Sequence, residues 1–318
     1  MLGKTGEFCF QSLESAQKDF PSPRGSRTFR PPPAGLPVIV LMNRWLPILT
    51  ALLLCVPWRA SAEPDGCVDD AALLKTLTRQ VQQLQEQKKL VPIKELREQL
   101  VRTRVALKLA APGAQPLAPA ELYRRVQGSV LIHCHLFNCS KCKRVHVNPS
   151  TCFPLTSDGI CVANYHAFIN SNTIAMAVAS RDGRVFPVTE VLAASARDDI
   201  AIFRVAADNL QPLLLAAPAA VGEPIAVISH PHSAFYVMTQ GAVARYCLEK
   251  GAPRMQITAD YAIGSSGGPV LGANGAVVGM VASTQTIYAD RQHGEPGNMQ
   301  MVVKLCVPCN SIRKLIKE

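Results

Sequence analysis

The chain is poor in aromatic residues, which make up 6% of its 318 positions, and only 18% of its residues are charged, whereas 48% are hydrophobic. Low charge and ample hydrophobic content exclude an intrinsically disordered chain, because enough apolar side chains exist to build a core. The sequence also has no cluster of basic residues interleaved with aromatics. We therefore expect no nucleic-acid partner, despite a formal net charge of +10.

Long hydrophobic runs are scarce as well. The longest near the N-terminus, residues 46–58, is short for a helix that spans a bilayer, which needs about 20 residues. It follows the basic residue Arg44 and precedes small residues at 60 and 62, a layout typical of a cleaved signal peptide over residues 42–62. This predicts a secreted or periplasmic protein. The alternative is an uncleaved membrane anchor with the rest of the chain exported.

Residues 1–41 are rich in proline, serine and arginine, and we expect no folded structure there. Residues 1–62 hold seven of the 33 basic and three of the 23 acidic residues, so 26 basic and 20 acidic residues remain after cleavage. A net charge of +6 indicates solubility or a mild preference for acidic surfaces rather than a dedicated anionic partner.

Residues 69–109 lack glycine altogether and differ in character from the rest of the chain. Their apolar residues recur at intervals of three and four, which predicts two helices separated at Pro92 within a helical or coiled-coil segment over residues 63–112. The stripe comprises Leu74, Leu77, Val81, Leu84, Val91, Ile93, Leu96, Leu100 and Leu107. A stripe this narrow fits a coiled coil that makes a homo-oligomer, or a helix folded back onto its own chain.

Residues 264–268 read Gly-Ser-Ser-Gly-Gly and follow an apolar run. Glycine permits a sharp turn that brings backbone N–H groups close to a substrate carbonyl. Such a turn suits a nucleophilic Ser266 whose oxyanion is stabilised by the N–H groups of Gly264 and Ser266. Strings of this kind also occur in plain flexible turns.

A nucleophilic serine needs a histidine base and a carboxylate that orients it. Residues 159–166 predict a strand that ends at His166, and residues 197–203 place two acids, Asp198 and Asp199, just before another strand. His166 could instead be a core histidine, and Asp199 an ordinary acid at the start of a strand.

Together these three strings resemble those of trypsin-like serine endopeptidases, in particular the HtrA/Deg-like branch, and the resemblance extends over residues 117–318. It implies an all-β fold of two six-stranded antiparallel β-barrels, preceded here by the α-helical segment. It also implies a catalytic triad of His166, Asp199 and Ser266, with Asp199 preferred to Asp198 because the family string begins at the acid before Ile-Ala. No cofactor is implied, and no PDZ domain is expected after Glu318.

The resemblance also places the substrate. Ala282, Ser283 and Thr284 are expected to pair with an extended polypeptide as an added strand. Asp260 lies six residues before Ser266, where trypsin has its specificity acid, but its surroundings resemble the HtrA version, so a preference for basic residues is not favoured.

Nine cysteines follow the predicted signal peptide, an odd number: Cys67, Cys134, Cys139, Cys142, Cys152, Cys161, Cys247, Cys306 and Cys309. Export favours disulfides. The spacing Cys139-x2-Cys142-x3-His146, with a second pair at Cys306-x2-Cys309, also suits a structural zinc. Two rival functions stay open: a catalytically silent binding protein with a protease fold, and a metal- or redox-sensing protein that uses its Cys/His cluster.

Overall fold

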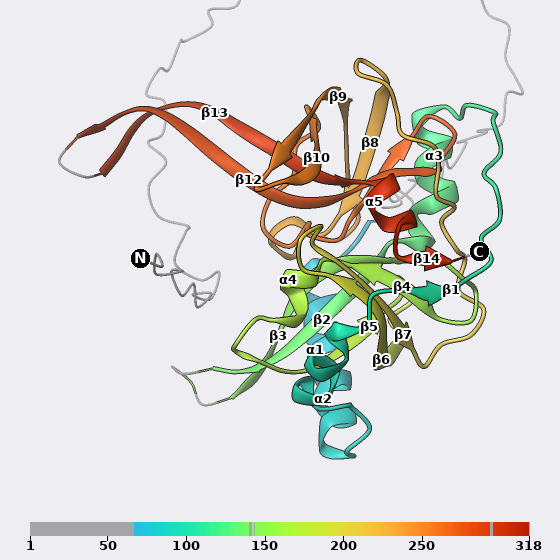
Figure 1. Cartoon of the computed structure of the whole chain (residues 1–318). Helices are drawn as coiled ribbons and strands as arrows, with labels where there is room; N and C mark the ends of the chain where they lie inside the picture. The colour runs from blue at the N-terminus through green and yellow to red at the C-terminus, as the bar shows by residue number, and fades with distance from the viewer. Residues whose placement is uncertain (1–66, 140–141, 143, 293–294, 318) are drawn as a thin grey trace, which may run out of the picture. The chain divides into compact units, whose positions relative to one another are not determined.

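The computed structural model describes residues 67–139, 142, 144–292 and 295–317 (Figure 1). The predicted upstream segment 1–41 and signal peptide 42–62 lie outside these ranges. Within them, no helix has the length and hydropathy needed to cross a bilayer.

Six antiparallel strands close the first barrel in the order β2-β3-β4-β7-β6-β5. They are β2 (Leu131–Asn138), β3 (Val145–Pro154), β4 (Ile160–Ala163), β5 (Thr173–Ala179), β6 (Val185–Ser195) and β7 (Ile200–Val205). The short helix α4 (Tyr165–Phe168) follows β4 directly.

The second barrel closes in the order β10-β13-β12-β11-β8-β9. Its strands are β8 (Pro224–Ser229), β9 (Val237–Glu249), β10 (Ala252–Ile257), β11 (Pro269–Gly272), β12 (Val277–Gln292) and β13 (Glu295–Pro308). A 3-10 turn, η3 (Pro231–Ser233), follows β8. β12 and β13 continue past the barrel as a long projecting hairpin (Figure 1).

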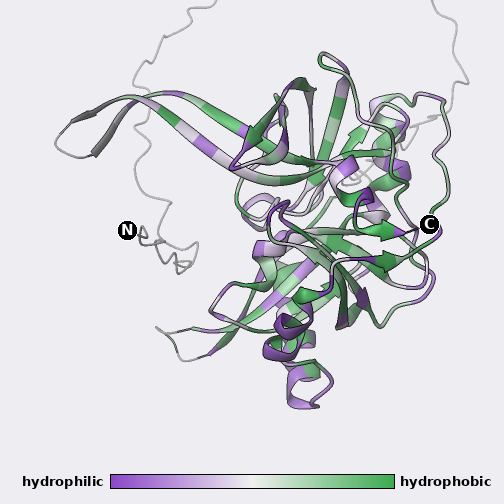
Figure 2. Cartoon of the chain, viewed as in Figure 1, coloured by the Kyte–Doolittle hydropathy of each residue, from purple (hydrophilic) through white to green (hydrophobic). Residues whose placement is uncertain are grey.

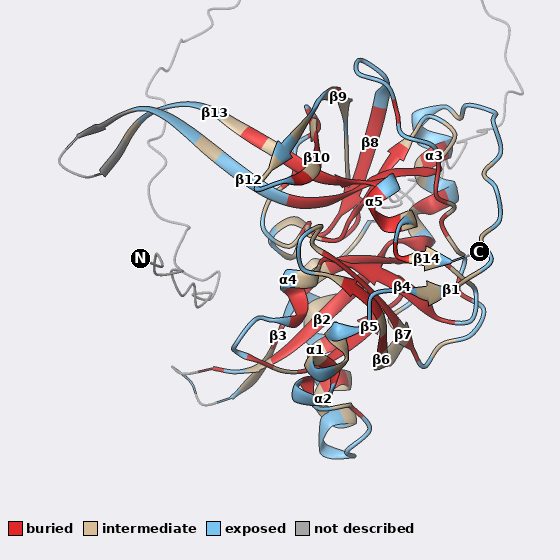
Figure 3. Cartoon of the chain, in the orientation of Figure 1, coloured by how far each residue is buried: buried red, intermediate tan, exposed pale blue. Residues whose placement is uncertain are grey.

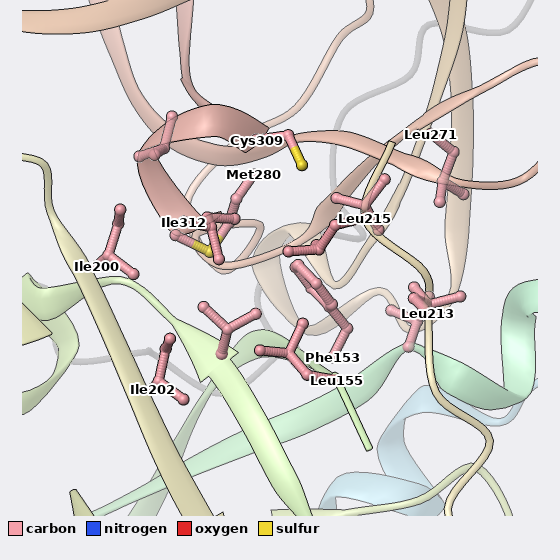
Figure 4. Close-up of a cluster of buried hydrophobic side chains, with 14 of the residues drawn as sticks. Phe153, Leu155, Ile200, Ile202, Leu213, Leu215, Leu271, Met280, Cys309 and Ile312 are labelled. Atoms are coloured by element: carbon pink, nitrogen blue, oxygen red, sulfur yellow. The ribbon is translucent and has the colours of Figure 1, made fainter. Parts of the chain in front are cut away.

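Strands β4 and β7 are hydrophobic on both faces because each face meets a different core. In β7, Ala201 and Phe203 point into the first barrel, whereas Ile200 and Ile202 join a cluster shared with the second barrel. Alternate residues of a strand point to opposite faces, so a continuous apolar run is what this position requires. Figure 4 shows the shared cluster, which holds the barrels together, and the buried residues concentrate in both barrels in Figure 3.

The N-terminal helices α1 (Asp70–Glu86) and α2 (Ile93–Glu98) lie on the first barrel. Leu77 and Val81 of α1 are fully buried against barrel residues such as Ile132 and Val147. Burial of such side chains stabilises the fold by about 1.5–3 kcal/mol each. Hydrophilic residues cover much of the rest of both helices (Figure 2). The apolar stripe thus packs on its own chain, as the fold-back alternative expects; an oligomer through these helices stays a prediction.

The second N-terminal helix is shorter than the sequence predicts. It ends at Glu98, continues as a 3-10 turn η1 (Gln99–Val101), and the chain then forms strand β1 (Val105–Ala106). The prediction of helix through Leu107 is therefore wrong. Here β1 pairs in parallel with β14 (Ile316–Lys317) at the other end of the chain, and Leu107 packs against the shared core.

Three further elements complete the fold. Helix α3 (Pro119–Val126) and the 3-10 turn η2 (Gln127–Ser129) lead into β2, and α5 (Cys309–Arg313) follows β13. The segment before α3 is tied to the second barrel, since Leu117 N donates to the carbonyl of Ala273 at 2.8 Å. Two six-stranded barrels preceded by helices confirm the expected fold class.

Candidate active site

His166 and Asp199 face each other where strands β4 and β7 lie side by side. Ala163, the last residue of β4, pairs with Ala201 of β7, so the segments beyond these residues meet. The Nδ1 atom of His166 lies 2.9 Å from Asp199 Oδ2 and 3.1 Å from Oδ1, and the backbone N–H of His166 donates to Oδ1 at 2.9 Å. The carboxylate therefore fixes both the ring and the backbone of the histidine.

Asn164 adds a further contact to this pair. Its Nδ2 donates to Asp199 Oδ2 at 3.1 Å and to the Asp199 carbonyl at 3.2 Å. Asp199 has a φ of +62°, a left-handed conformation that aspartate tolerates better than most residues. Asp198 points elsewhere, because its carboxylate accepts a hydrogen bond from Ser195 Oγ at 3.2 Å. Asp199 is thus the acid that contacts His166.

The predicted nucleophile turn lies between the two barrels. Gly267 has a φ of +84°, and a Cβ atom there would come within 2.0 Å of the Thr151 carbonyl oxygen and 3.5 Å of the Cα atom of Ala163. Only glycine fits this close approach. Because Ala163 ends the strand that leads to His166, the nucleophile turn lies against the segment that leads to the His166–Asp199 pair.

Two backbone N–H groups of the turn are available to a substrate. Within the described residues, neither Gly264 N–H nor Ser266 N–H donates to a protein acceptor, whereas those of Ser265 and Gly267 donate to the carbonyls of Ala262 and Val281. Gly264 has a φ of +97°, which strains any side chain, and a Cβ would lie 2.4 Å from the His230 carbonyl oxygen. The turn can present these two donors to a developing oxyanion.

The two serines of the turn have different environments. Ser265 is fully buried, and its Oγ accepts a hydrogen bond from Ser229 Oγ at 2.9 Å. Ser266 is half-buried, and its hydroxyl donates to the Ala282 carbonyl at 3.4 Å; in this structure it makes no hydrogen bond to His166. Attack on a substrate therefore requires the Ser266 hydroxyl to turn toward the imidazole.

Thr151, in the last part of β3 in the first barrel, was not identified from the sequence. Its backbone N–H donates to the Ser266 carbonyl at 2.9 Å, and its Oγ1 donates to the Gly264 carbonyl at 2.9 Å. Thr151 is fully buried. No local pattern marks this residue, because its partners lie more than 110 positions away in the sequence.

A cavity of about 190 Å³ opens beside Ser266. Its lining is mostly apolar and comprises Tyr261, Ala262, Ile263, Ser266, Val281, Ala282, Ser283 and Thr284. The three predicted substrate-binding residues, Ala282, Ser283 and Thr284, all belong to it. Asp260 does not; its side chain is 87% exposed and lies 3.3 Å from Lys304 Nζ.

The predicted substrate strand is open on one edge. Residues of β12 pair with β13 on one side, while pairing with β11 on the other side ends at Met280. Val281 then bonds to Gly267 and Gly268 of the nucleophile turn. Beyond Val281, no strand of the described chain covers this edge, so an extended peptide could pair with it.

Helix α4 is held from the N-terminal segment, a contact that the sequence did not reveal. Arg97 of α2 donates through Nε to the Phe168 carbonyl at 2.9 Å and through Nη2 to the Asn170 carbonyl at 2.6 Å. Phe168 is the last residue of α4, the helix that contains His166. Arg97 therefore fixes the far end of that short helix.

Three histidines of the described chain are buried outside the candidate triad: His133, His135 and His230. The side chains of the last two have hydrogen-bond partners. His135 shares a 2.8 Å hydrogen bond with Ser150 Oγ, next to Thr151. Burial, with a smaller effect of the His166 charge, lowers the pKa of His135 to about 4. His230 accepts a hydrogen bond from Tyr236 N–H, and burial lowers its pKa to about 3. Both rings are therefore neutral near pH 7.

The structure brings together one of the two predicted metal knuckles. Donor atoms of Cys139, Cys142 and His146 all lie within 4.8 Å of one another. Cys306 of β13 and Cys309 of α5 are buried and form no such cluster among the described residues, so the idea that the fold joins the two knuckles is wrong. None of the nine described cysteines forms a disulfide, and disulfide formation stays a prediction.

Part of the chain is similar to known proteins. Residues 150–280 match the family described as trypsin-like peptidase domain. A probable periplasmic serine endoprotease DegP-like from Halomonas elongata is 30% identical over 136 residues, which cover 40% of this chain and 28% of that protein. The chain thus spans well under half of that relative. The expected resemblance to trypsin-like, HtrA-type proteases is confirmed.

Among solved structures, a serine endoprotease from Yersinia pestis aligns with a TM-score of 0.47 and 18% identity, over 63% of this chain and 66% of that chain.

Proposed function

We propose that this chain, which resembles trypsin-like proteases of the HtrA type, is a serine endopeptidase that hydrolyses peptide bonds of exported proteins through His166, Asp199 and Ser266. The main support is the close approach of Gly267 to Ala163, where an added Cβ atom would lie 3.5 Å from the Ala163 Cα atom, because it sets the nucleophile turn against the strand that leads to His166. The Asp199–His166 pair and the two available N–H groups of the turn supply the remaining parts.

In this mechanism, Asp199 binds the Nδ1–H of His166 and leaves Nε2 free to accept a proton. As Ser266 Oγ attacks the substrate carbonyl, its proton passes to His166, and the N–H groups of Gly264 and Ser266 stabilise the oxyanion. His166 then protonates the leaving amine. Water repeats the sequence on the acyl-enzyme and releases the acid.

The substrate is a polypeptide bound in extended form along the open edge of β12, at Ala282, Ser283 and Thr284. Main-chain hydrogen bonds supply affinity in this mode, and side-chain pockets supply selectivity. The cavity beside Ser266 has no charged lining residue. A small aliphatic side chain before the scissile bond fits it better than lysine or arginine.

A binding protein without turnover is the second candidate, and one observation favours it. Ser266 Oγ donates to the Ala282 carbonyl rather than to His166. If that hydrogen bond persists with substrate present, peptides bind along β12 but are not cleaved.

Reaction of the full chain with a fluorophosphonate probe separates the two candidates. The proposal expects one covalent adduct per chain, located on Ser266 by peptide mass mapping and absent from Ser266→Ala. Ser157→Ala, which changes an exposed serine in the turn between β3 and β4, is the matched control and should label like the wild type. A wild-type chain that binds peptides but takes up no probe would support the binding protein instead.

A further inference from the structure

The tip of the hairpin formed by β2 and β3 gathers three metal-binding side chains outside the candidate active site. The two strands pair without interruption from Leu131 opposite Cys152 to Asn138 opposite Val145. Cys139 follows β2, and its backbone N–H donates to the Arg144 carbonyl at 2.8 Å, which closes the turn. We propose that Cys139, Cys142 and His146 bind one Zn²⁺ ion at this tip.

The distances suit a tetrahedral ion. Zinc binds sulfur at about 2.3 Å and imidazole nitrogen at about 2.0–2.1 Å, so ligand atoms around it lie roughly 3.5–3.8 Å apart. Here the three donor atoms lie within 4.8 Å of one another, and Cys142 Sγ lies 2.9 Å from His146 Nε2. Side-chain adjustments of about an ångström complete the geometry.

The surrounding structure holds the ligands in place and leaves a path for the ion. Cys139 is 7% exposed, whereas Cys142 is exposed, so solvent reaches the cluster from one side. Gln82 of α1 donates to the Val145 carbonyl at 2.7 Å, next to His146. The ring of Phe137 lies 5.9 Å from that of His146. The helix and the strand ladder therefore fix the base of the site before metal arrives.

The chemistry of the donors selects zinc. Two thiolates and one imidazole favour zinc over magnesium or calcium, which prefer oxygen ligands, and no carboxylate belongs to the cluster among the described residues. Binding releases the thiol protons, so the ion and two thiolates form a neutral unit. By contrast, burial raises the pKa of Cys134 and of Cys306 to about 12, which keeps those thiols protonated.

The bound ion crosslinks strands β2 and β3 at the turn of the hairpin. With three protein ligands, a water molecule completes the tetrahedron. The same strand, β3, continues to Thr151, which bonds to the Ser266 and Gly264 carbonyls. Zinc thus closes the outer end of the hairpin whose inner end supports the nucleophile turn. This inference does not depend on the proposed protease activity.

The test uses the full chain, reduced and stripped with a chelator, and titrates it with Zn²⁺ against a chromophoric competitor. We expect one equivalent to bind. Loss of an outer-shell partner weakens metal binding by about 10- to 100-fold. Loss of a ligand should weaken it more, in each of the variants Cys139→Ser, Cys142→Ser and His146→Ala. Cys247→Ser, a half-buried cysteine of β9, is the matched control and should bind like the wild type.

Cobalt substitution of the wild type supplies a second readout that does not depend on the folding of any variant. Co²⁺ at the site should give a thiolate-to-cobalt charge-transfer band with an intensity for two sulfur ligands. Three results would overturn the proposal: less than a tenth of an equivalent of bound Zn²⁺, the absence of that band, or a Zn²⁺ affinity of Cys142→Ser equal to that of the wild type. A Cys139–Cys142 disulfide would also overturn it, if found in exported protein whose free thiols were alkylated before isolation. Fluorophosphonate labelling of Ser266 tests the protease proposal separately.

Discussion

Thr151 of the first barrel and Ser266 of the second are joined by a 2.9 Å hydrogen bond from the Thr151 N–H to the Ser266 carbonyl. The Thr151 hydroxyl adds a second bond, to the Gly264 carbonyl. One residue thereby fixes the nucleophile turn on both sides of Ser265. The position of Ser266 relative to the other barrel consequently depends on Thr151.

Thr151→Val should slow catalysis by misplacing this turn. The change keeps the shape of the side chain and the backbone bond but leaves the Gly264 carbonyl without its hydroxyl donor, which costs about 1–3 kcal/mol. We expect kcat to fall about 10-fold with little change in KM. Thr189→Val is the matched control, because Thr189 Oγ1 also donates to a backbone carbonyl, that of Arg204, away from the site. Steady-state kinetics and denaturant unfolding of both variants measure the difference; equal effects on kcat would contradict the prediction.

Asp199→Asn should reduce activity far more than Asp198→Asn. The amide of asparagine can donate to His166 Nδ1 and so favours the tautomer that has its proton on Nε2, which blocks the base. Loss of the corresponding acid in a serine-protease triad lowers kcat by about 10⁴-fold. Asp198 accepts from Ser195 and does not contact His166, so its variant should retain kcat within about 2-fold. The rates of fluorophosphonate labelling of the two variants measure this difference. Similar losses in both would show that Asp199 does not have the role given to it here.

Much of the candidate site was predictable because its chemistry lies in short local strings. The segments around His166, Asp199 and Ser266 each join a strand to a turn, and the residue types needed for the chemistry are adjacent in sequence. The preference for Asp199 over Asp198 came from family resemblance rather than from the residues, and the 2.9 Å contact with His166 agrees with it.

The supporting residues could not be predicted, since their roles arise from distant contacts. Arg97 meets the Phe168 carbonyl 71 positions away, and no periodic pattern records such a bond. The prediction of how far the second helix extends was wrong for a related reason. Leu107 fits the helical spacing, but it lies in an extended segment beside β14 and is partly buried against the shared core, so the same apolar residue serves a different local structure.

Arg97→Gln should loosen helix α4 and thereby misplace His166. Arg97 supplies two hydrogen bonds to the carbonyls of Phe168 and Asn170, and glutamine is too short to reach both. We expect kcat to fall about 10- to 100-fold, because small misplacements of a catalytic group have effects of this size. Arg102→Gln is the control from the same segment; it bonds to the Val191 carbonyl of β6 rather than to α4. A loss of kcat in Arg102→Gln as large as that in Arg97→Gln would indicate general destabilisation only.

Cleavage should favour small aliphatic residues immediately before the scissile bond. The cavity beside Ser266 has a volume of about 190 Å³ and apolar walls that include Ala262 and Val281. Asp260 lies outside it, paired with Lys304. Profiling with a peptide library should therefore give the same preference for the wild type and Asp260→Asn. Preferred cleavage after lysine or arginine, lost in Asp260→Asn, would refute this assignment.

Stability should fall as the pH drops from about 6.5 to 4, partly through His135. The unfolded chain takes up a proton on this residue near its ordinary pKa of about 6.5, whereas the folded chain does so only at about 4. Between these values the unfolded state binds more protons, so the free energy of unfolding decreases with falling pH, by about 1.4 kcal/mol per unit for one such group. Above pH 6.5 the ring is neutral in both states and the loss vanishes.

His135→Gln removes this titration and preserves a polar partner for Ser150, so its free energy of unfolding should depend less steeply on pH than that of the wild type. His232→Asn, at an exposed histidine with a φ of +49° that asparagine tolerates, is the control and should keep the wild-type slope. Urea unfolding at pH 7, 5.5 and 4.5 measures the slopes. Because burial also lowers the pKa of His133 and lowers that of His230 to about 3, part of the slope should persist in His135→Gln. Parallel curves for wild type and His135→Gln would show that His135 is protonated equally in both states.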